Sequence, residues 1–145
     1  MNWTLGFVGA GVMAETKIDG LRAEGMDGHR IVASHRRPER LAALADHGIR
    51  TTLDNREAAA ADVVVLSVKP QTLLPVLAGI AGATRPEALV LSIVAGARRR
   101  VITSALGHAR VVRCMPNLPC RIRQGMTVWC AGAEASADDR ARVRA

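Results

Sequence analysis

The sequence has 145 residues, of which 49% are hydrophobic and only 2% aromatic, so we expect a single domain with an aliphatic core. Its net charge of +7 comes from scattered arginines without interleaved aromatic residues, and we therefore expect no nucleic-acid partner. The 3 Cys form no C-x-x-C pair, which argues against a disulfide framework and a zinc site, and the start of the chain has neither a basic leader nor an apolar run of membrane-spanning length. We accordingly expect a cytoplasmic protein that meets no membrane.

Short apolar runs alternate along the chain with longer helix-like segments, which is the pattern of βαβ units in a parallel sheet. The apolar runs are rich in valine and do not alternate with polar residues, as is typical of strands covered on both faces. Strands are expected over residues 5–8, 30–34, 49–52, 62–68, 88–94, 109–114 and 126–131, and helices over residues 12–23, 38–46, 56–60, 71–78 and 98–106. The pattern predicts an α/β fold, Rossmann-type and doubly wound, with a mostly parallel sheet and helices on both faces.

Residues that favour helix ends agree with these boundaries. Pro38 and Pro70 stand where helices would begin, a position that tolerates a missing amide hydrogen. Glycines follow three expected helices, at positions 25, 48 and 107, where a left-handed conformation would end the helix. Ser136 would cap one more helix, which begins shortly before the last residue of the sequence.

The first strand runs into Gly9-Ala10-Gly11-Val12-Met13-Ala14, which matches the G-x-G-x-x-G/A fingerprint of dinucleotide-binding loops. Gly9 permits a tight turn, Gly11 lets a pyrophosphate approach the backbone, and Ala14 lets the helix pack closely. The helix start, including Val12 and Met13, supplies unpaired amides for an anion. A purely structural glycine turn is the alternative, but the order of strand, loop, helix and second strand favours a dinucleotide site.

The second strand ends in Ser34-His35-Arg36-Arg37, where an NAD-selective domain would carry a carboxylate for the ribose hydroxyls. Guanidinium groups would instead hold a 2′-phosphate, so NADP(H) is favoured over NAD(H). The alternative is that both arginines only solvate a loop. His35 would either stack on the adenine or lie exposed, and the sequence leaves both open.

Several segments together resemble pyrroline-5-carboxylate reductases, over nearly the whole stretch from Leu5 to Ala131. The segments that carry the resemblance are Gly6–Glu15, Arg36–Leu41, Asp54-Asn55, Val68-Lys69-Pro70-Gln71, Ser92–Gly96 and Arg113–Pro119. The V-K-P-Q and M-P-N-x-P segments are the most specific of them.

The resemblance implies NADPH-dependent reduction of 1-pyrroline-5-carboxylate, a small-molecule imine, to proline. It places Asn55 near the adenosine part of the cofactor, and it places near the nicotinamide the residues Val68, Lys69, Pro70, Ala95, Gly96, Met115, Pro116 and Asn117. It also implies that the catalytic residues and the homo-oligomer contacts belong to a C-terminal helical domain. We therefore expect residues 1–133 to form the NADP(H)-binding domain and residues 134–145 to begin a helix leading toward that absent domain. No metal site is expected.

The chain departs from the family pattern in several places: Val12, Lys17, Leu118 and Cys120 stand where the family usually has Asn, an apolar residue, Thr and Ala, and Arg121-Ile122-Arg123 is unusually basic for its loop. These departures leave other functions open. The substrate could be another imine or a β-hydroxyacid, or the coenzyme a deazaflavin. A non-catalytic module that senses NADP(H) or binds a partner is the remaining alternative.

Overall fold

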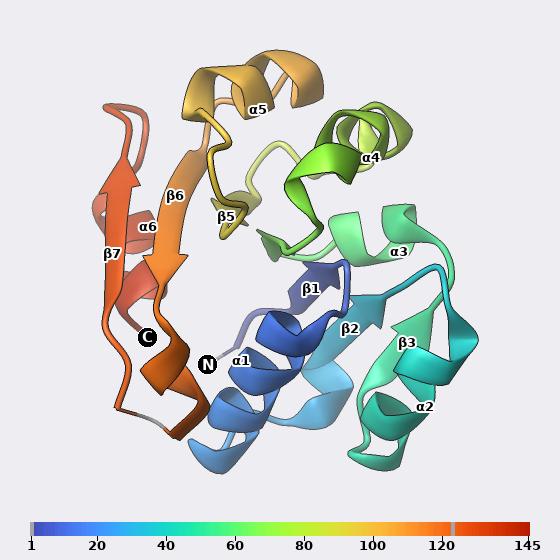
Figure 1. Ribbon diagram of the computed structural model, residues 1–145. Helices are drawn as coiled ribbons and strands as arrows, with labels where there is room; N and C mark the ends of the chain where they lie inside the picture. Colours follow the sequence, from blue (N-terminus) through green and yellow to red (C-terminus); the bar gives the residue numbers. More distant parts are fainter. Residues whose placement is uncertain (1, 123) are drawn as a thin grey trace.

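A twisted seven-stranded sheet runs through the molecule (Figure 1). The computed structural model describes residues 2–122 and 124–145. The strand order is β3-β2-β1-β4-β5-β6-β7; all neighbours pair in parallel except β7, which pairs antiparallel with β6. The strands are β1 Leu5–Val8, β2 Ile31–Ser34, β3 Arg50–Thr52, β4 Val63–Leu66, β5 Leu89–Ser92, β6 Val111–Pro116 and β7 Thr127–Ala131.

Helices cover both faces of this sheet. The α-helices are α1 Val12–Ala23, α2 Pro38–Asp46, α3 Asn55–Ala59, α4 Leu73–Ile80, α5 Arg99–Leu106 and α6 Ala137–Arg144, and the 3-10 helices are η1 Gly28–Arg30, η2 Pro70–Thr72 and η3 Leu118–Ile122. In Figure 1, α3, α4 and α5 line up along the upper side of the view, on one face of the sheet. Helices α1, α2 and α6 lie on the other face.

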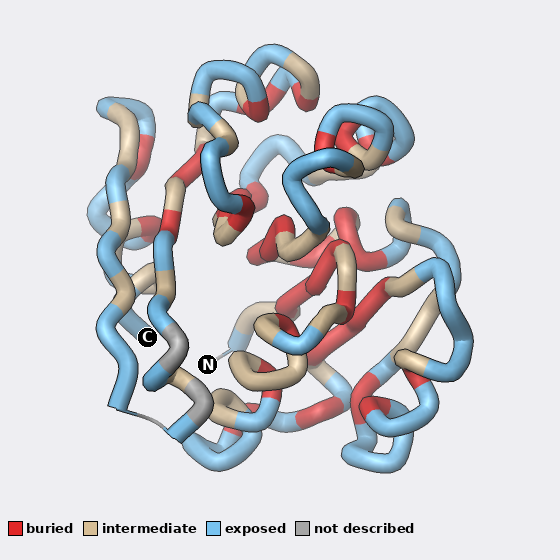
Figure 2. Tube along the Cα trace, viewed as in Figure 1, coloured by how far each residue is buried: buried red, intermediate tan, exposed pale blue. Residues whose placement is uncertain are grey.

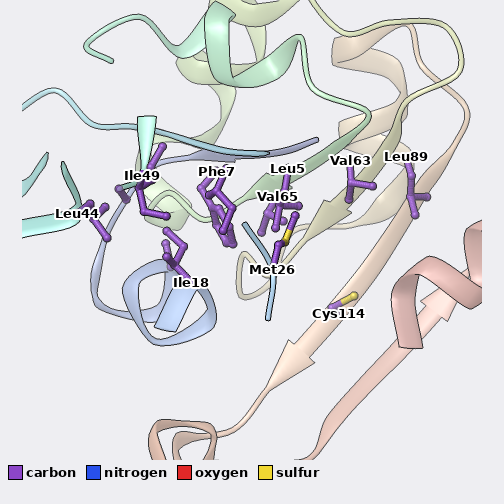
Figure 3. Close-up of a cluster of buried hydrophobic side chains, with 14 of the residues drawn as sticks. Leu5, Phe7, Ile18, Met26, Leu44, Ile49, Val63, Val65, Leu89 and Cys114 are labelled. Carbon is purple, nitrogen blue, oxygen red and sulfur yellow. The ribbon is translucent and has the colours of Figure 1, made fainter. Parts of the chain in front are cut away.

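Each face has its own apolar cluster. Figure 3 shows the first, where Phe7 and Val65 of the sheet meet Ile18 of α1 and Leu44 of α2. The second cluster packs the opposite sides of the strands against α3, α4 and α5. All residues of β1, β2 and β4 are buried, as the continuous red of the central strands in Figure 2 reflects, whereas β7 at the edge alternates between half-buried and exposed residues.

The structure confirms the predicted fold class and most element positions. The helices over residues 12–23 and 38–46 agree with prediction, and Gly25, Gly48 and Gly107 all have positive φ. Ser136 caps α6 through a capping box with Asp139. Within the described residues, no helix is both long and apolar enough to cross a bilayer.

Some predicted boundaries were wrong by a few residues. The strand expected over 62–68 ends at Leu66, although the Ser67 N–H still donates to Val8 O in continuation of the pairing with β1, and η2 begins soon after at Pro70. The helix expected over 71–78 begins at Leu73, after Pro70 has opened the 3-10 helix η2. The strand expected over 109–114 runs from Val111 to Pro116, because pairing with β7 extends it.

Candidate functional site

The loop between β1 and α1 is held from both sides by the ends of neighbouring strands. The N–H groups of Gly9 and Ala10 donate to Ser34 O at 3.1 and 2.7 Å. On the other side, the Ser67 hydroxyl donates to Gly9 O at 2.6 Å. Gly9 has φ +94°, and a Cβ there would lie 2.7 Å from Val68 Cγ1. The turn at position 9 therefore requires glycine for its conformation and for its close approach to Val68, just after β4.

Gly11, the residue before α1, differs from Gly9, because the fold itself does not require glycine there. Its φ of −86° is ordinary for any residue, and a Cβ at this position would meet no protein atom within 4 Å. No side chain of the described residues caps the helix here, so the first amides of α1 are open to an anion. Ala14 is fully buried, whereas Val12 is 54% exposed. The empty space beside Gly11 is what a diphosphate lying against the backbone needs.

At the end of β2, the hydroxyl group of Ser34 forms hydrogen bonds within the protein. Its side chain is fully buried, and Oγ lies 3.2 Å from Phe7 O and 2.7 Å from Asn55 Oδ1. Asn55, the first residue of α3, is half-buried beside it. The two residues therefore connect the carboxyl ends of β2 and β3, and both lie at the predicted site.

The segment after Ser34 presents a basic surface. Arg36 and Arg37 are exposed, and within residues 2–122 and 124–145 neither forms an ion pair. The carboxylate of Glu15 in α1 forms an ion pair with the guanidinium group of Arg40, at 3.0 Å. Arg40 was not among the predicted site residues, although it comes three positions after Arg37.

His35 accepts a hydrogen bond at Nδ1 from the N–H of Arg37, at 3.0 Å. The pKa of His35 is below its ordinary value, first because burial removes water from the ring and then because three arginines of the same segment are near. The ring is therefore neutral at physiological pH, and it lies half-buried at the edge of the basic surface.

The residues predicted near the nicotinamide lie at or after the ends of β4, β5 and β6. Lys69 is exposed, and its carbonyl accepts hydrogen bonds from the Thr72 N–H and hydroxyl, both at 3.0 Å, while Val68 is half-buried and Pro70 begins η2. Gly96, beside exposed Ala95, has φ +71°. These residues shape the turns that leave the sheet.

At the end of β6, Met115 is 43% exposed and Pro116 is the last residue of the strand. The side-chain oxygen of Asn117 accepts the Met126 N–H at 2.9 Å, so Asn117 fixes the connection to β7. The neighbouring departure at position 118 lies outside the residues whose side chains are described.

All predicted site residues lie at or just after the carboxyl ends of the parallel strands, on one edge of the sheet. The order of the strands reverses direction between β1 and β4, which is where ligands bind in open α/β sheets. The residues present fit a phosphorylated dinucleotide: an open helix start, space beside Gly11, and two arginines in place of a carboxylate after β2. Sequence reasoning missed Ser67, because a serine at a strand end carries no signal of its own.

The strand order and the glycine loop place the chain in the class of Rossmann-type oxidoreductase domains. A family profile described as "NADP oxidoreductase coenzyme F420-dependent" matches residues 4–96. The chain belongs to this family.

Among individual proteins, pyrroline-5-carboxylate reductases resemble the chain along nearly its whole length, which confirms the resemblance seen in the motifs. The enzyme of Pseudomonas aeruginosa is 46% identical over 136 residues, covering 92% of this chain and 50% of the relative. The enzyme of Pisum sativum is 36% identical, covering 95% of this chain and 51% of the relative. The chain thus spans about half the length of the curated relatives it matches.

The solved structures agree with these sequence matches. A pyrroline-5-carboxylate reductase from Coxiella burnetii superposes with a TM-score of 0.90 at 36% identity, covering 99% of this chain and 54% of that one. A pyrroline carboxylate reductase from Plasmodium falciparum superposes with a TM-score of 0.85 at 23% identity, covering 98% of this chain and 53% of that one. The latter likeness is evidence of the fold alone.

Proposed function

We propose that this chain binds NADP(H) and is the nucleotide-binding part of a pyrroline-5-carboxylate reductase, an enzyme of proline biosynthesis. The observation that carries the proposal is the combination of an open glycine loop with Arg36 and Arg37 after β2, where no carboxylate stands. Two guanidinium groups attract a 2′-phosphate, whereas a carboxylate would repel it.

Each part of the edge has a role in this proposal. Gly9, Gly11 and the amides of Val12, Met13 and Ala14 hold the diphosphate. Arg36 and Arg37 hold the 2′-phosphate, His35 lies against the adenine, and Ser34 and Asn55 shape the floor below the ribose. The turns that line the nicotinamide are formed by Val68, Lys69, Pro70, Ala95, Gly96, Met115, Pro116 and Asn117.

When bound, NADPH supplies the hydride, and the chain's residues bind and orient it. The substrate is an imine, and its own polar contacts are proposed to lie in the part of the relatives that this chain does not match. Residues 1–133 form the nucleotide-binding domain, and residues 134–145 begin a helix toward a further helical domain. We place the whole protein in the cytoplasm as a homo-oligomer.

The test is a titration of the purified chain with NADPH, NADP⁺ and NADH, in which binding is measured by tryptophan fluorescence or by calorimetry. Because charge-assisted hydrogen bonds contribute about 1.5–3 kcal/mol each, we expect NADPH to bind at least about tenfold more tightly than NADH. The double variant Arg36→Ala/Arg37→Ala should lose this preference. Arg50→Ala/Arg100→Ala removes the same charge at two exposed positions elsewhere and should retain it.

Equal affinity for NADPH and NADH in the wild type, or an undiminished preference in the Arg36/Arg37 variant, would contradict the proposal. A proline-forming assay tests whether the substrate contacts lie outside this chain. Hydride transfer requires donor and acceptor in near-attack geometry, so the 145 residues should bind NADPH and turn over little substrate. Full turnover by the chain alone would show that it contains the substrate contacts.

The name of the matching family favours one second candidate, hydride transfer between NADP and a deazaflavin coenzyme. The matched residues 4–96 include the glycine loop and the arginines, which both functions need. The comparison needs a longer protein that also contains the half of the relatives that this chain does not match. Turnover of reduced F420 but not of 1-pyrroline-5-carboxylate by that protein would favour this candidate.

A further inference from the structure

Lys17 reaches from the middle of α1 to the connection between β6 and β7. Its ammonium Nζ donates to Cys120 Sγ at 3.6 Å and to Thr127 Oγ1 at 3.4 Å. Lys17 is half-buried, one residue before the fully buried Ile18. These two contacts, the Lys17 tether, join residues 103 and 110 positions apart in the sequence.

The tether contacts the connection between β6 and β7 at two points, Cys120 and Thr127, and this connection begins at Asn117. Cys120 lies in η3, and its N–H donates to Asn117 O at 3.1 Å. Thr127 begins β7 and pairs with Pro116 of β6. Between them, Asn117 accepts the Met126 N–H through its side chain and donates its own N–H to Met126 O, at 2.9 and 3.3 Å. The partners of Lys17 are therefore connected to Met115, Pro116 and Asn117 by backbone and side-chain hydrogen bonds.

The other end of the tether is α1, whose first amides form the glycine loop. Lys17 follows Val12 by five residues, which is about 7.5 Å along a helix axis. Apart from contacts through the sheet, η3 packs directly on α1. Lys17 and Cys120 are both departures from the family pattern, and here they contact each other.

We propose that Lys17 is a positioning residue that sets the relation between the glycine loop and the Met115–Asn117 edge of the site. The inference rests on the proposed function, because these two regions are the diphosphate and nicotinamide sides of one NADP(H) site. A tether of this kind affects a ligand that spans both regions and leaves unaffected a ligand that occupies only the adenosine side.

The experiment compares NADPH with 2′,5′-ADP, which carries the adenosine and its 2′-phosphate but no nicotinamide. Lys17→Met keeps the length of the side chain and removes the cation. It should weaken the affinity for NADPH by about threefold to tenfold, the effect of one or two lost hydrogen bonds, and change the affinity for 2′,5′-ADP by less than about twofold. Lys17→Arg, which retains a cation, should restore most of the NADPH affinity. Arg22→Met removes a cation from the same helix and should leave both affinities unchanged.

A double-mutant cycle tests the named contact. Cys120→Ala should weaken NADPH binding less in Lys17→Met than in the wild-type background, because the Lys17–Cys120 contact is already absent there, whereas the contact of Cys120 Sγ with Asn117 Oδ1 at 4.0 Å is lost in both backgrounds. Additive effects would show that the two residues act separately. Equal weakening of NADPH and 2′,5′-ADP in Lys17→Met would show a general structural role, and no weakening would show no role, so either result overturns the proposal.

Failure of the proposed function is distinguishable from failure of this inference. A wild-type chain that binds neither ligand refutes the NADP(H) site itself. In that case hydrogen exchange decides on the tether: Lys17→Met should speed exchange of the peptide that contains the Met126 amide, with Arg22→Met as control. Unchanged exchange there would show that Lys17 does not hold the β6–β7 connection.

Discussion

Gly9 and Gly11 belong to the same loop, but the structure predicts opposite consequences for adding one methyl group at each. Gly9→Ala should destabilise the fold, because Gly9 has φ +94° and its added Cβ would meet Val68 Cγ1 at 2.7 Å. Gly11→Ala should fold almost as the wild type, because nothing lies within 4 Å of its added Cβ. The space that this methyl would fill is the space proposed for the diphosphate.

The expected magnitudes follow from these two geometries. A left-handed conformation costs an alanine about 1–2 kcal/mol, and relieving an overlap in packed surroundings adds about 1–3 kcal/mol. Gly9→Ala should therefore lower the melting temperature by about 5–15 °C. Gly25→Ala is the matched control for the cost of the left-handed conformation alone, because Gly25 has φ +90° and open space around it. At the helix start, Gly11→Ala should cost less than about 1 kcal/mol.

Thermal unfolding and NADPH titration of the three variants provide the assay. We expect the loss of stability to rank Gly9→Ala above Gly25→Ala above Gly11→Ala, while only Gly11→Ala combines a normal melting temperature with at least about tenfold weaker NADPH binding. A stable Gly11→Ala variant that binds NADPH as the wild type does would refute the reasoning about the loop.

Four further measurements test the rest of the structure. Burial raises the pKa of Asp139, but hydrogen bonds from Arg110 and Ser136 outweigh this effect and hold the pKa below its ordinary value. The carboxylate therefore stabilises the fold at neutral pH, and acid titration should show this contribution complete above about pH 4 and lost progressively as the pH falls from there through the lowered pKa. Asp139→Asn should cost about 3 kcal/mol in urea unfolding, because Asp139 is fully buried against Arg110, and an unchanged midpoint would contradict this. Burial raises the pKa of Cys114 to about 11, so iodoacetamide at pH 8 should modify exposed Cys130 and leave Cys114 as a thiol in peptide mass spectra. Ser34→Ala should cost about 1–2 kcal/mol, because it leaves the buried side of Asn55 without its partner, and a loss of NADPH binding without a loss of stability would assign the hydroxyl to the ligand instead.

Local sequence patterns predicted the mostly parallel sheet, the burial of its strands on both faces and the glycine loop before α1. Helix α1 could be placed because a glycine loop precedes it and the apolar residues Ala14 and Ile18 recur one turn apart. The capping box of Ser136 and Asp139 is likewise local. Such features depend on residues within one turn or one strand, and a single sequence displays them.

Contacts between distant segments could not be predicted in this way. The reach of Lys17 to Cys120 and Thr127 depends on how η3 packs on α1, which no window of the sequence records. The same holds for Arg110 and Asp139, which join the segment just before β6 to α6. The end of β6 at Pro116 was missed because proline argues against a strand, and only the antiparallel pairing with Thr127 shows that the strand continues.

A crystal structure of this chain with NADP⁺ tests the proposed site in one measurement. The account predicts that the diphosphate lies against Gly11 and the first amides of α1, with the 2′-phosphate between the guanidinium groups of Arg36 and Arg37. A nucleotide bound at another place, or a 2′-phosphate pointing away from both arginines, would contradict it.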